Sequence, residues 1–251
     1  MRMMICALAG ALACAQTAPP LAFDVASIKP SPPDARGGMI RPRPGGQSYV
    51  AANVPLWLMI KLMYKVTDSQ ISGGPEWMNS DRFDIEARAE RPSNIDELHE
   101  MFKTLLADRF ALKFHTETRE LPMLALTVDK SGQKMKLSES QQPFEIPIKP
   151  AGRGKVAGER VPMSHLAWFL AQQLNRPVVD QTGLDAFYDF ELEWAPEPPP
   201  GLAIPQNELR DRPEGPDLFS AVRQQLGLKL ESQKGPVQVM VIDHVEKPSA
   251  N

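Results

Sequence analysis

The sequence repeats itself, and this repeat restricts the possible folds more than any other feature of the chain. Phe23-Asp24-Val25 with Ile28-Lys29-Pro30 returns as Phe144-Glu145-Ile146 with Ile148-Lys149-Pro150. Further matched pairs follow in the same order: Val54-Pro55-Leu56 with Val161-Pro162-Met163, Phe83-Asp84-Ile85-Glu86 with Tyr188-Asp189-Phe190-Glu191, and Leu126-Thr127-Val128-Asp129 with Met240-Val241-Ile242-Asp243. Because the matches keep one order, we expect two copies of one folding unit.

Each copy carries the signals of two helices. Pro55 and Pro162 suit the first turn of a helix, where a missing N–H group costs nothing, so helices are expected over about 55–66 and 162–174. The second helix of the first copy is expected to begin at Ser93, and its apolar residues continue at helical spacing.

Capping residues mark the ends of these second helices. In the first copy, Asp96 completes a capping box with Ser93. In the second copy, Asp217 is expected to cap the start of the helix, and Gly227 is expected to end it.

Two strands follow each second helix and are expected to pair as a hairpin. The turns would contain Leu121-Pro122 in the first copy and Gly235-Pro236 in the second. The strands are expected over 112–118 with 123–129 and over 228–232 with 237–245. We therefore predict an α+β fold that is an internal duplication of a small helix-on-sheet module, with antiparallel or mixed sheets.

The chain is expected to divide into a leader and two repeats. Residues 1–15 have the basic start, short apolar run and small-residue end of a signal peptide. The first repeat would span residues 16–140 and the second 141–251, with a proline-rich and charged loop insertion at 195–216. Both cysteines, Cys6 and Cys14, lie in the leader, so a periplasmic or secreted protein without thiols is expected; lipidation at Cys14 is the less favoured alternative.

The overall charge argues against two classes of partner. The formal net charge is -3 at pH 7, so the chain has no basic excess that would attract nucleic acid. No stretch in the mature chain approaches the ~20 apolar residues of a transmembrane helix. We expect no nucleic-acid partner and no transmembrane span.

Residues for metal or nucleophilic catalysis are not grouped along the chain. The four histidines lack the spacing of a zinc site, so no metal site and no cofactor are expected. Ser131-Gly132-Gln133-Lys134 matches the S-x-x-K pattern of penicillin-binding enzymes. That pattern needs a serine at the start of a buried helix, whereas this tetrapeptide follows an expected strand, so a surface turn is predicted.

Carboxylates on two expected strands are the alternative catalytic residues. Asp84 with Glu86, and Asp189 with Glu191, alternate with apolar residues, so each pair would share one strand face. Two carboxylates about 7 Å apart lie within the range that glycoside hydrolysis uses. The same alternation is typical of a half-buried strand with one solvated face, and this is the favoured interpretation.

Basic and aromatic side chains are the candidate binding residues. Arg41 and Arg43 precede the first helix of one copy, and Arg153 and Arg160 precede the first helix of the other, so both sets could bind an anionic polymer or polypeptide. Trp77 follows Gly73-Gly74-Pro75 and is expected in an exposed turn. Trp168 and the other aromatic residues of the first helices are expected in the core.

Several motifs resemble a known family. They are Gly73-Gly74-Pro75-x-Trp77, Leu105-Leu106-Ala107-Asp108-Arg109-Phe110, Glu117-Thr118-Arg119-Glu120-Leu121-Pro122 and Val179-Asp180-x-Thr182-Gly183-Leu184. They resemble the soil-associated family of secreted acidobacterial proteins, a domain of unknown function. Similar domains occur attached to membrane metallopeptidase sensors, which implies a sensing or docking role outside the cytoplasm. The segment 48–56 is also similar to the short N-terminal modules of secretins and TonB-dependent receptors, which implies a small α+β interaction module.

Two functions remain open from the sequence. The first is an exported, non-catalytic interaction protein of the bacterial cell envelope. It would hold an envelope protein or polymer, with a membrane metallopeptidase sensor as one candidate partner, in a groove between the copies or at a strand edge. The alternative is a cofactor-free envelope hydrolase that uses the strand carboxylates.

Overall fold

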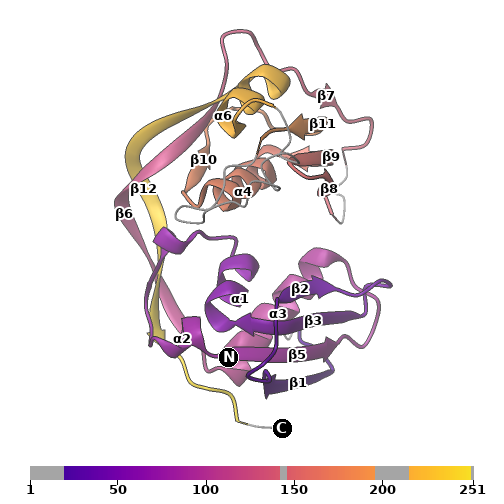
Figure 1. Cartoon of the computed structure of the whole chain (residues 1–251), viewed down its shortest axis with the longest axis vertical. Coiled ribbons are helices and arrows are strands. Elements are labelled where there is room, and N and C mark those ends of the chain that lie inside the picture. Colours follow the sequence, from indigo (N-terminus) through magenta and orange to yellow (C-terminus); the bar gives the residue numbers. More distant parts are fainter. Residues whose placement is uncertain (1–19, 142–145, 196–214, 250–251) are drawn as a thin grey trace, which may run out of the picture.

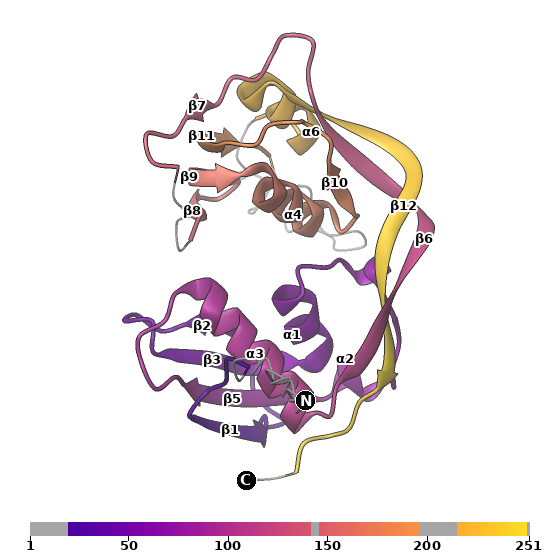
Figure 2. The same ribbon diagram turned by 180° about the vertical axis from the view of Figure 1, so that it is seen from behind.

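A computed structural model describes residues 20–141, 146–195 and 215–249. The first half of the molecule holds the elements β1 (Val25–Pro30), β2 (Met39–Pro42), β3 (Ser48–Pro55), α1 (Leu56–Met63), η1 (Asp68–Gln70), β4 (Ile71–Gly73), α2 (Trp77–Ser80), β5 (Arg82–Arg88) and α3 (Ile95–Arg109). The second half holds β7 (Lys136–Leu137), β8 (Ile148–Gly152), β9 (Lys155–Pro162), α4 (Met163–Leu174), β10 (Val178–Asp180), β11 (Phe187–Glu193), α6 (Leu218–Ala221) and η2 (Val222–Leu226). Two long strands, β6 (Lys113–Val128) and β12 (Leu228–His244), join the halves as a curved ribbon along one side (Figures 1 and 2).

Within the described residues, the strands form three four-stranded sheets. The first half has the order β1-β5-β3-β2, and the second half has the order β7-β11-β9-β8. The third sheet has the order β10-β6-β12-β4. The two ribbon strands pair antiparallel with each other, and each outer strand pairs in parallel with the ribbon strand beside it. The predicted α+β fold with antiparallel and mixed sheets is confirmed. The two halves share one strand order, and the duplication of the sequence itself stays a prediction.

The ribbon replaces the two hairpins that the sequence led us to expect. β6 runs through Leu121-Pro122 without a turn, β12 runs through Gly235-Pro236, and the two strands pair with each other, with Leu121 opposite Gly235. The expected turns are therefore wrong. Both prolines lie in the stretch where the sheet is only two strands wide, because β10 joins β6 at Leu124 and β4 joins β12 at Met240. Proline is tolerated at such edges, where its missing N–H group is not needed.

The helix ends follow the expected capping chemistry with one shift. α3 is capped by Asn94, whose side chain accepts a hydrogen bond from the N–H of Glu97 at 2.9 Å in a capping box. The expected box at Ser93 is wrong by one residue, because Ser93 is buried and its hydroxyl donates to the carbonyl of Arg91. In the second half, the predicted cap at Asp217 and the predicted end at Gly227 are confirmed, although the segment divides into α6 and the π-helical η2.

Each half has its own hydrophobic core, and the ribbon contributes to both. Met240 and Ile242 of β12 pack in the core of the first half, although they come from the end of the chain. Leu124 and Leu126 of β6 pack in the core of the second half. The boundary expected between residues 140 and 141 therefore does not coincide with the boundary between the two cores, because each core takes residues from both sides of it.

Two segments predicted from the sequence lie wholly or mostly outside the residues that the structure describes. The signal peptide at 1–15 lies outside the described residues, as do residues 196–214 of the insertion at 195–216. At the base of that insertion, the N–H of Ala195 donates to the carbonyl of Pro216 at 2.9 Å. Among the described residues, no helix has both the length and the apolar character needed to cross a membrane.

Candidate functional site

A cleft of about 640 Å³ lies between the two halves. Its walls come from α3 of the first half and from α4 and β10 of the second half, and Pro236, Val237 and Gln238 of the ribbon also line it. The lining combines apolar groups with polar ones, because four prolines and several valines alternate with histidine, glutamine and charged side chains. Ligand sites in proteins commonly have this character, a largely apolar concavity with a few placed polar groups.

His99 on α3 brings a partly buried imidazole to the cleft. Its Nε2 lies 3.1 Å from the hydroxyl oxygen of the buried Tyr49, and the two rings meet edge to face. Burial, with a contribution from the positive charge of Lys65, lowers the pKa of His99 to about 4, so that it is neutral at pH 7. The Nδ1 atom of His99 is shielded from solvent and has no hydrogen-bond partner among the described residues.

The second half contributes His165 and Trp168 from adjacent turns of α4. Their rings lie edge to face with centroids 5.1 Å apart. Burial also lowers the pKa of His165 to about 4, with smaller effects from Lys65 and from His99 in the other half. The Nε1 atom of Trp168 is likewise shielded and has no partner among the described residues. Such a group carries a desolvation cost on the order of 1–3 kcal/mol.

Three charged residues complete the described lining of the cleft. Lys65 and Asp96 belong to the first half, and their charged atoms lie 4.0 Å apart. Arg160 belongs to the second half, and its guanidinium lies 3.8 Å from the carboxylate of Glu159. Each of these two cations therefore lies close to a carboxylate, Lys65 to Asp96 and Arg160 to Glu159.

The four strand carboxylates lie outside this cleft and make structural contacts. Asp84 accepts hydrogen bonds from the hydroxyl of Ser31 at 2.6 Å and from the N–H of Asn53 at 2.8 Å. Asp189 accepts one from the N–H of Arg160 at 2.8 Å. Asn53 and Arg160 both have positive φ, at 54° and 50°, so each aspartate supports a bulge just before a helix.

The two glutamates of these pairs are exposed and face basic side chains. Glu86 lies 3.1 Å from Arg43, and Glu191 lies 2.8 Å from Lys155. The alternation predicted for both strands is confirmed, because apolar side chains are buried between the carboxylates. The Asp84 pair belongs to the sheet of the first half and the Asp189 pair to the sheet of the second half, so the structure does not bring the four together.

Of the predicted binding residues, Arg160 alone lies among the described residues that line the cleft. Arg41 and Arg43 are exposed on and beside β2, and Arg153 is exposed in the turn between β8 and β9. Trp77 does not lie in an exposed turn, and this expectation is corrected. It begins α2, is half-buried, and packs edge to face on Phe83 with centroids 6.3 Å apart, since the chain after Gly74 folds back onto the core.

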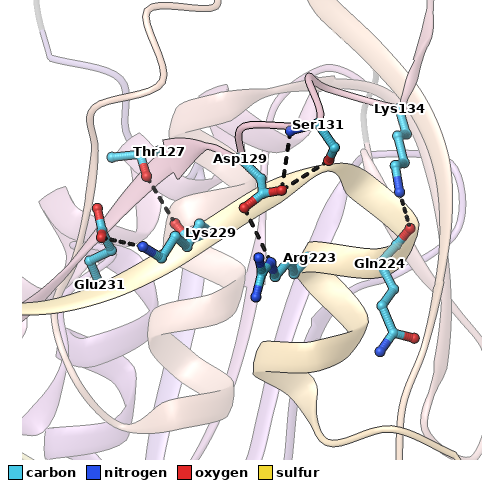
Figure 3. Close-up of polar contacts among 8 residues, drawn as sticks. All are labelled: Thr127, Asp129, Ser131, Lys134, Arg223, Gln224, Lys229 and Glu231. Carbon is cyan, nitrogen blue, oxygen red and sulfur yellow. Dashed lines mark hydrogen bonds and ion pairs between the residues drawn. The ribbon is translucent and has the colours of Figure 1, made fainter.

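The S-x-x-K tetrapeptide forms the turn that was predicted. Figure 3 shows Asp129 at the end of β6 accepting hydrogen bonds from the N–H and the hydroxyl of Ser131 and pairing with Arg223. Lys134 donates instead to the carbonyl of Gln224, at 3.0 Å. Ser131 and Lys134 therefore have separate partners, and Asp129 and Lys134 tie the end of the ribbon to η2.

Sequence reasoning missed the histidines and Trp168 as members of one site. The histidines are 66 positions apart, so no local spacing connects His99 with His165. The repeat did carry a signal, because aligning Pro55 with Pro162 places His165 opposite Leu58 and Trp168 opposite Lys61.

Metal-binding chemistry is not indicated by the described part of the chain. Within residues 20–141, 146–195 and 215–249, no three histidine, cysteine, aspartate or glutamate side chains are grouped so that they could hold a metal ion. The described lining of the cleft offers nitrogen groups for hydrogen bonding, two cations that each lie near a carboxylate, and apolar walls.

Comparison with known proteins gives one match. No curated protein and no solved structure matches the chain. The sequence profile of the family described as "Protein of unknown function (DUF3738)" matches residues 58–245, which include α3, α4, the ribbon and all of the cleft lining named above. Because this match spans most of the sequence, the chain belongs to the DUF3738 family.

Proposed function

We propose that this protein is an exported, non-catalytic binding protein of the bacterial cell envelope that holds a protein or an envelope polymer in the cleft between its halves. The observation that carries the proposal is the cleft itself, which is lined by both halves and by the ribbon. A site built from two halves positions its ligand only when both are folded together, as in many proteins that bind ligands between domains.

The chemistry of the cleft supports binding over hydrolysis. None of Asp84, Glu86, Asp189 and Glu191 is among the described residues that line it. The two aspartates support strand bulges and the two glutamates pair with surface cations, so each has a role that does not require catalysis.

The envelope location of this proposal rests on the sequence. Residues 1–15 have the layout of a signal peptide, and the motifs resemble those of secreted acidobacterial proteins and of domains attached to membrane metallopeptidase sensors. A sensor of that kind is one candidate partner.

The test is capture of partners from an envelope extract with a variant that fills the cleft. Ser164 is exposed on α4 and lines the cleft, so Ser164→Trp should obstruct it without disturbing either core. Gln233→Trp, at an exposed position of the ribbon outside the cleft lining, is the matched control. We expect the wild-type chain and the control to retain the same partner, and Ser164→Trp to lose it. Equal capture by all three would refute binding in the cleft.

A further inference from the structure

We propose that the cleft binds an uncharged, proline-rich peptide segment, whose main-chain carbonyl oxygens accept a hydrogen bond from one N–H group on each half of the molecule. This inference rests on the proposed function, because it names the class of partner for the same cleft. Three observations carry it: the two unpaired ring nitrogens, the paired charges of the described lining, and the apolar and aromatic walls.

The first observation is that both unpaired ring nitrogens are donors. The indole Nε1 of Trp168 always carries a proton. The buried hydroxyl of Tyr49 has Nε2 of His99 as its only hydrogen-bond partner among the described residues. If the hydroxyl donates to Nε2, both groups are satisfied and the ring proton of neutral His99 lies on Nδ1. The reverse arrangement would leave the hydroxyl proton as well as Nδ1 unpaired, so the first arrangement is favoured.

The two donors come from opposite halves and border one cleft. His99 lies on α3, Trp168 lies on α4, and both residues line the cleft. Both nitrogens are shielded from solvent and lack a partner among the described residues. A shielded donor without an acceptor is unfavourable, so a ligand that brings an acceptor to each nitrogen is stabilised by two hydrogen bonds. Each ring is half-buried, and a small rotation turns its N–H toward the cleft.

The second observation is that the cations of the described lining already lie beside carboxylates. The charged atoms of Lys65 and Asp96 are 4.0 Å apart, and those of Arg160 and Glu159 are 3.8 Å apart. The two cleft histidines are neutral at pH 7, because burial lowers their pKa values to about 4. A charged ligand would lose hydration in the cleft without meeting an unpaired opposite charge on the described lining, whereas an uncharged ligand avoids that loss.

The third observation is the character of the walls. Aromatic surface comes from Trp168, from His165 edge to face with it, and from Phe187. The remaining apolar lining includes four prolines, Pro147, Pro162, Pro177 and Pro236. Proline-rich segments dock in aromatic-lined grooves, and their polyproline II conformation is largely formed before binding, so little conformational entropy is lost.

The donor character of the unpaired groups favours proline over other uncharged ligands. A sugar hydroxyl donates as well as accepts, and an ordinary peptide brings one N–H group with each residue. Every such donor would need an acceptor of its own inside the cleft. A proline residue has a carbonyl oxygen and no N–H group, so a proline-rich segment supplies acceptors alone.

The first experiment observes one of the donors directly, by heteronuclear NMR of the isotope-labelled chain. The probe is hexaproline with blocked ends. We expect the indole N–H signal of Trp168, identified by its loss in Trp168→Phe, to move downfield as hexaproline is added. The signal of Trp57 is the matched control and should stay in place, because Trp57 lies outside the described lining and already donates to Asp68 at 3.0 Å. A stationary Trp168 signal would overturn the inference.

The second experiment measures affinity by fluorescence anisotropy with fluorescein-labelled peptides. Hexaproline should bind the wild-type chain at least tenfold more tightly than an alternating glycine–alanine hexapeptide, and Ser164→Trp should abolish this binding. Trp168→Phe and His99→Leu each remove one donor, so each should weaken hexaproline at least fivefold. Trp57→Phe removes an indole N–H group outside the described lining and should leave the affinity unchanged. An equal loss in Trp57→Phe and Trp168→Phe would contradict a specific role of the cleft donor.

A variant outside the described lining tests the proton position on His99. Tyr49→Phe removes the hydroxyl that keeps the ring proton on Nδ1, and Tyr49 itself does not line the cleft. We expect this variant to weaken hexaproline at least twofold while the weak affinity for the glycine–alanine peptide stays the same. Equal affinity of Tyr49→Phe and the wild-type chain for hexaproline would contradict donation from Nδ1.

The outcomes distinguish the inference from the proposed function. Equal affinities for the two peptides, both lost in Ser164→Trp, would overturn the proline-rich class while binding in the cleft stands. Binding of cellohexaose, with no binding of either peptide, would replace the peptide by an uncharged polysaccharide. Absence of binding by every probe would overturn the inference, and an unchanged capture from envelope extract by Ser164→Trp would separately overturn the proposed function.

Discussion

Gly227 ends η2 with a φ of 67° and lies against the turn that follows β6. A Cβ atom at this position would collide with the carbonyl oxygen of Gly132, in addition to the strain that an L-residue has at positive φ. One residue therefore joins the end of a helical segment, the start of β12 and the turn shown in Figure 3.

Replacing Gly227 tests this close approach. Gly227→Ala should lower the free energy of unfolding by about 3 kcal/mol, because a steric clash adds to backbone strain. Gly132→Ala is the matched control: its φ is 80°, but no neighbouring atom of the described residues lies within 4 Å of the added Cβ, so strain of about 1 kcal/mol is expected. Urea denaturation of the two variants measures the difference, and equal losses would contradict the proposed clash.

The two histidines of the cleft should make stability depend on pH. Their pKa values are lowered to about 4 in the folded chain, so between pH 6.5 and pH 4 the unfolded chain binds more protons. Their contribution to stability is present above pH 6.5 and is lost as the pH falls toward 4. Allowing for partial screening, the loss is about 2 kcal/mol for each histidine.

The variant His99→Gln/His165→Gln isolates this contribution. Between pH 6.5 and 4.5 the wild-type chain should lose more stability in urea denaturation than the double variant does. The carboxylates and the other histidines are common to both chains, so their titration cancels in the comparison. Parallel pH profiles would show that the cleft histidines are not buried as described.

At this scale, part of the site could be predicted and part could not. Arg160 was identified because it belongs to a basic segment before a helix, which is a local pattern. His99 comes from α3, whereas His165 and Trp168 come from α4, so their shared surroundings depend on how the halves are placed. A pKa lowered by burial cannot be read from neighbours along the chain.

Among the elements, the bulges before α1 and α4 have matching supports. In each half, an aspartate on the neighbouring strand accepts the N–H of a residue with positive φ, two positions before the N-cap proline. Asp84 and Asp189 therefore fix the direction in which the chain leaves β3 and β9 and enters the helix that follows each strand.

Removing these carboxylates should cost stability. Asp84→Ala and Asp189→Ala leave a main-chain N–H without its partner, so each should lower the free energy of unfolding by about 1–3 kcal/mol. Glu86→Ala and Glu191→Ala are the matched controls, because they remove only exposed ion pairs and should change stability by less than about 0.5 kcal/mol. A larger effect for the glutamates than for the aspartates, measured by thermal unfolding, would contradict this assignment.

Elements with local signals were predictable, and those that depend on distant pairing were not. The helices after Pro55 and Pro162 and the end at Gly227 follow from proline and glycine preferences that act within a few residues. The ribbon was missed because Leu121-Pro122 and Gly235-Pro236 look like turns unless the partner strand is known. The pairing of β6 with β12 joins residues a hundred or more positions apart, and no local rule specifies it.

For the molecule as a whole, the ribbon makes the two halves depend on each other. β12 returns to the first half to supply Met240 and Ile242, and β6 supplies Leu124 and Leu126 to the second half. Neither half contains all of its own core when the chain is divided between the ribbon strands.

Cutting the chain between Ser131 and Gly132 tests this dependence. Fragments 20–131 and 132–249 should each unfold without a cooperative transition, because each lacks one ribbon strand and part of a core. Mixed together, they should elute from size-exclusion chromatography as a one-to-one complex with a sharp melting transition. A cooperative transition of fragment 20–131 alone, at the temperature of the intact chain, would contradict it.

The return of β12 also determines how tension would pass through the molecule. Phe23 near the start and Val245 near the end of the described chain both pack on the core of the first half. A pulling force applied between these two ends would act on the first half and on the last residues of β12. The second half would not lie between the two points of attachment and would carry no force. In a chain stretched between two attachments, the wall of the cleft that is formed by α4 and β10 would thus carry no force until the first half unfolded.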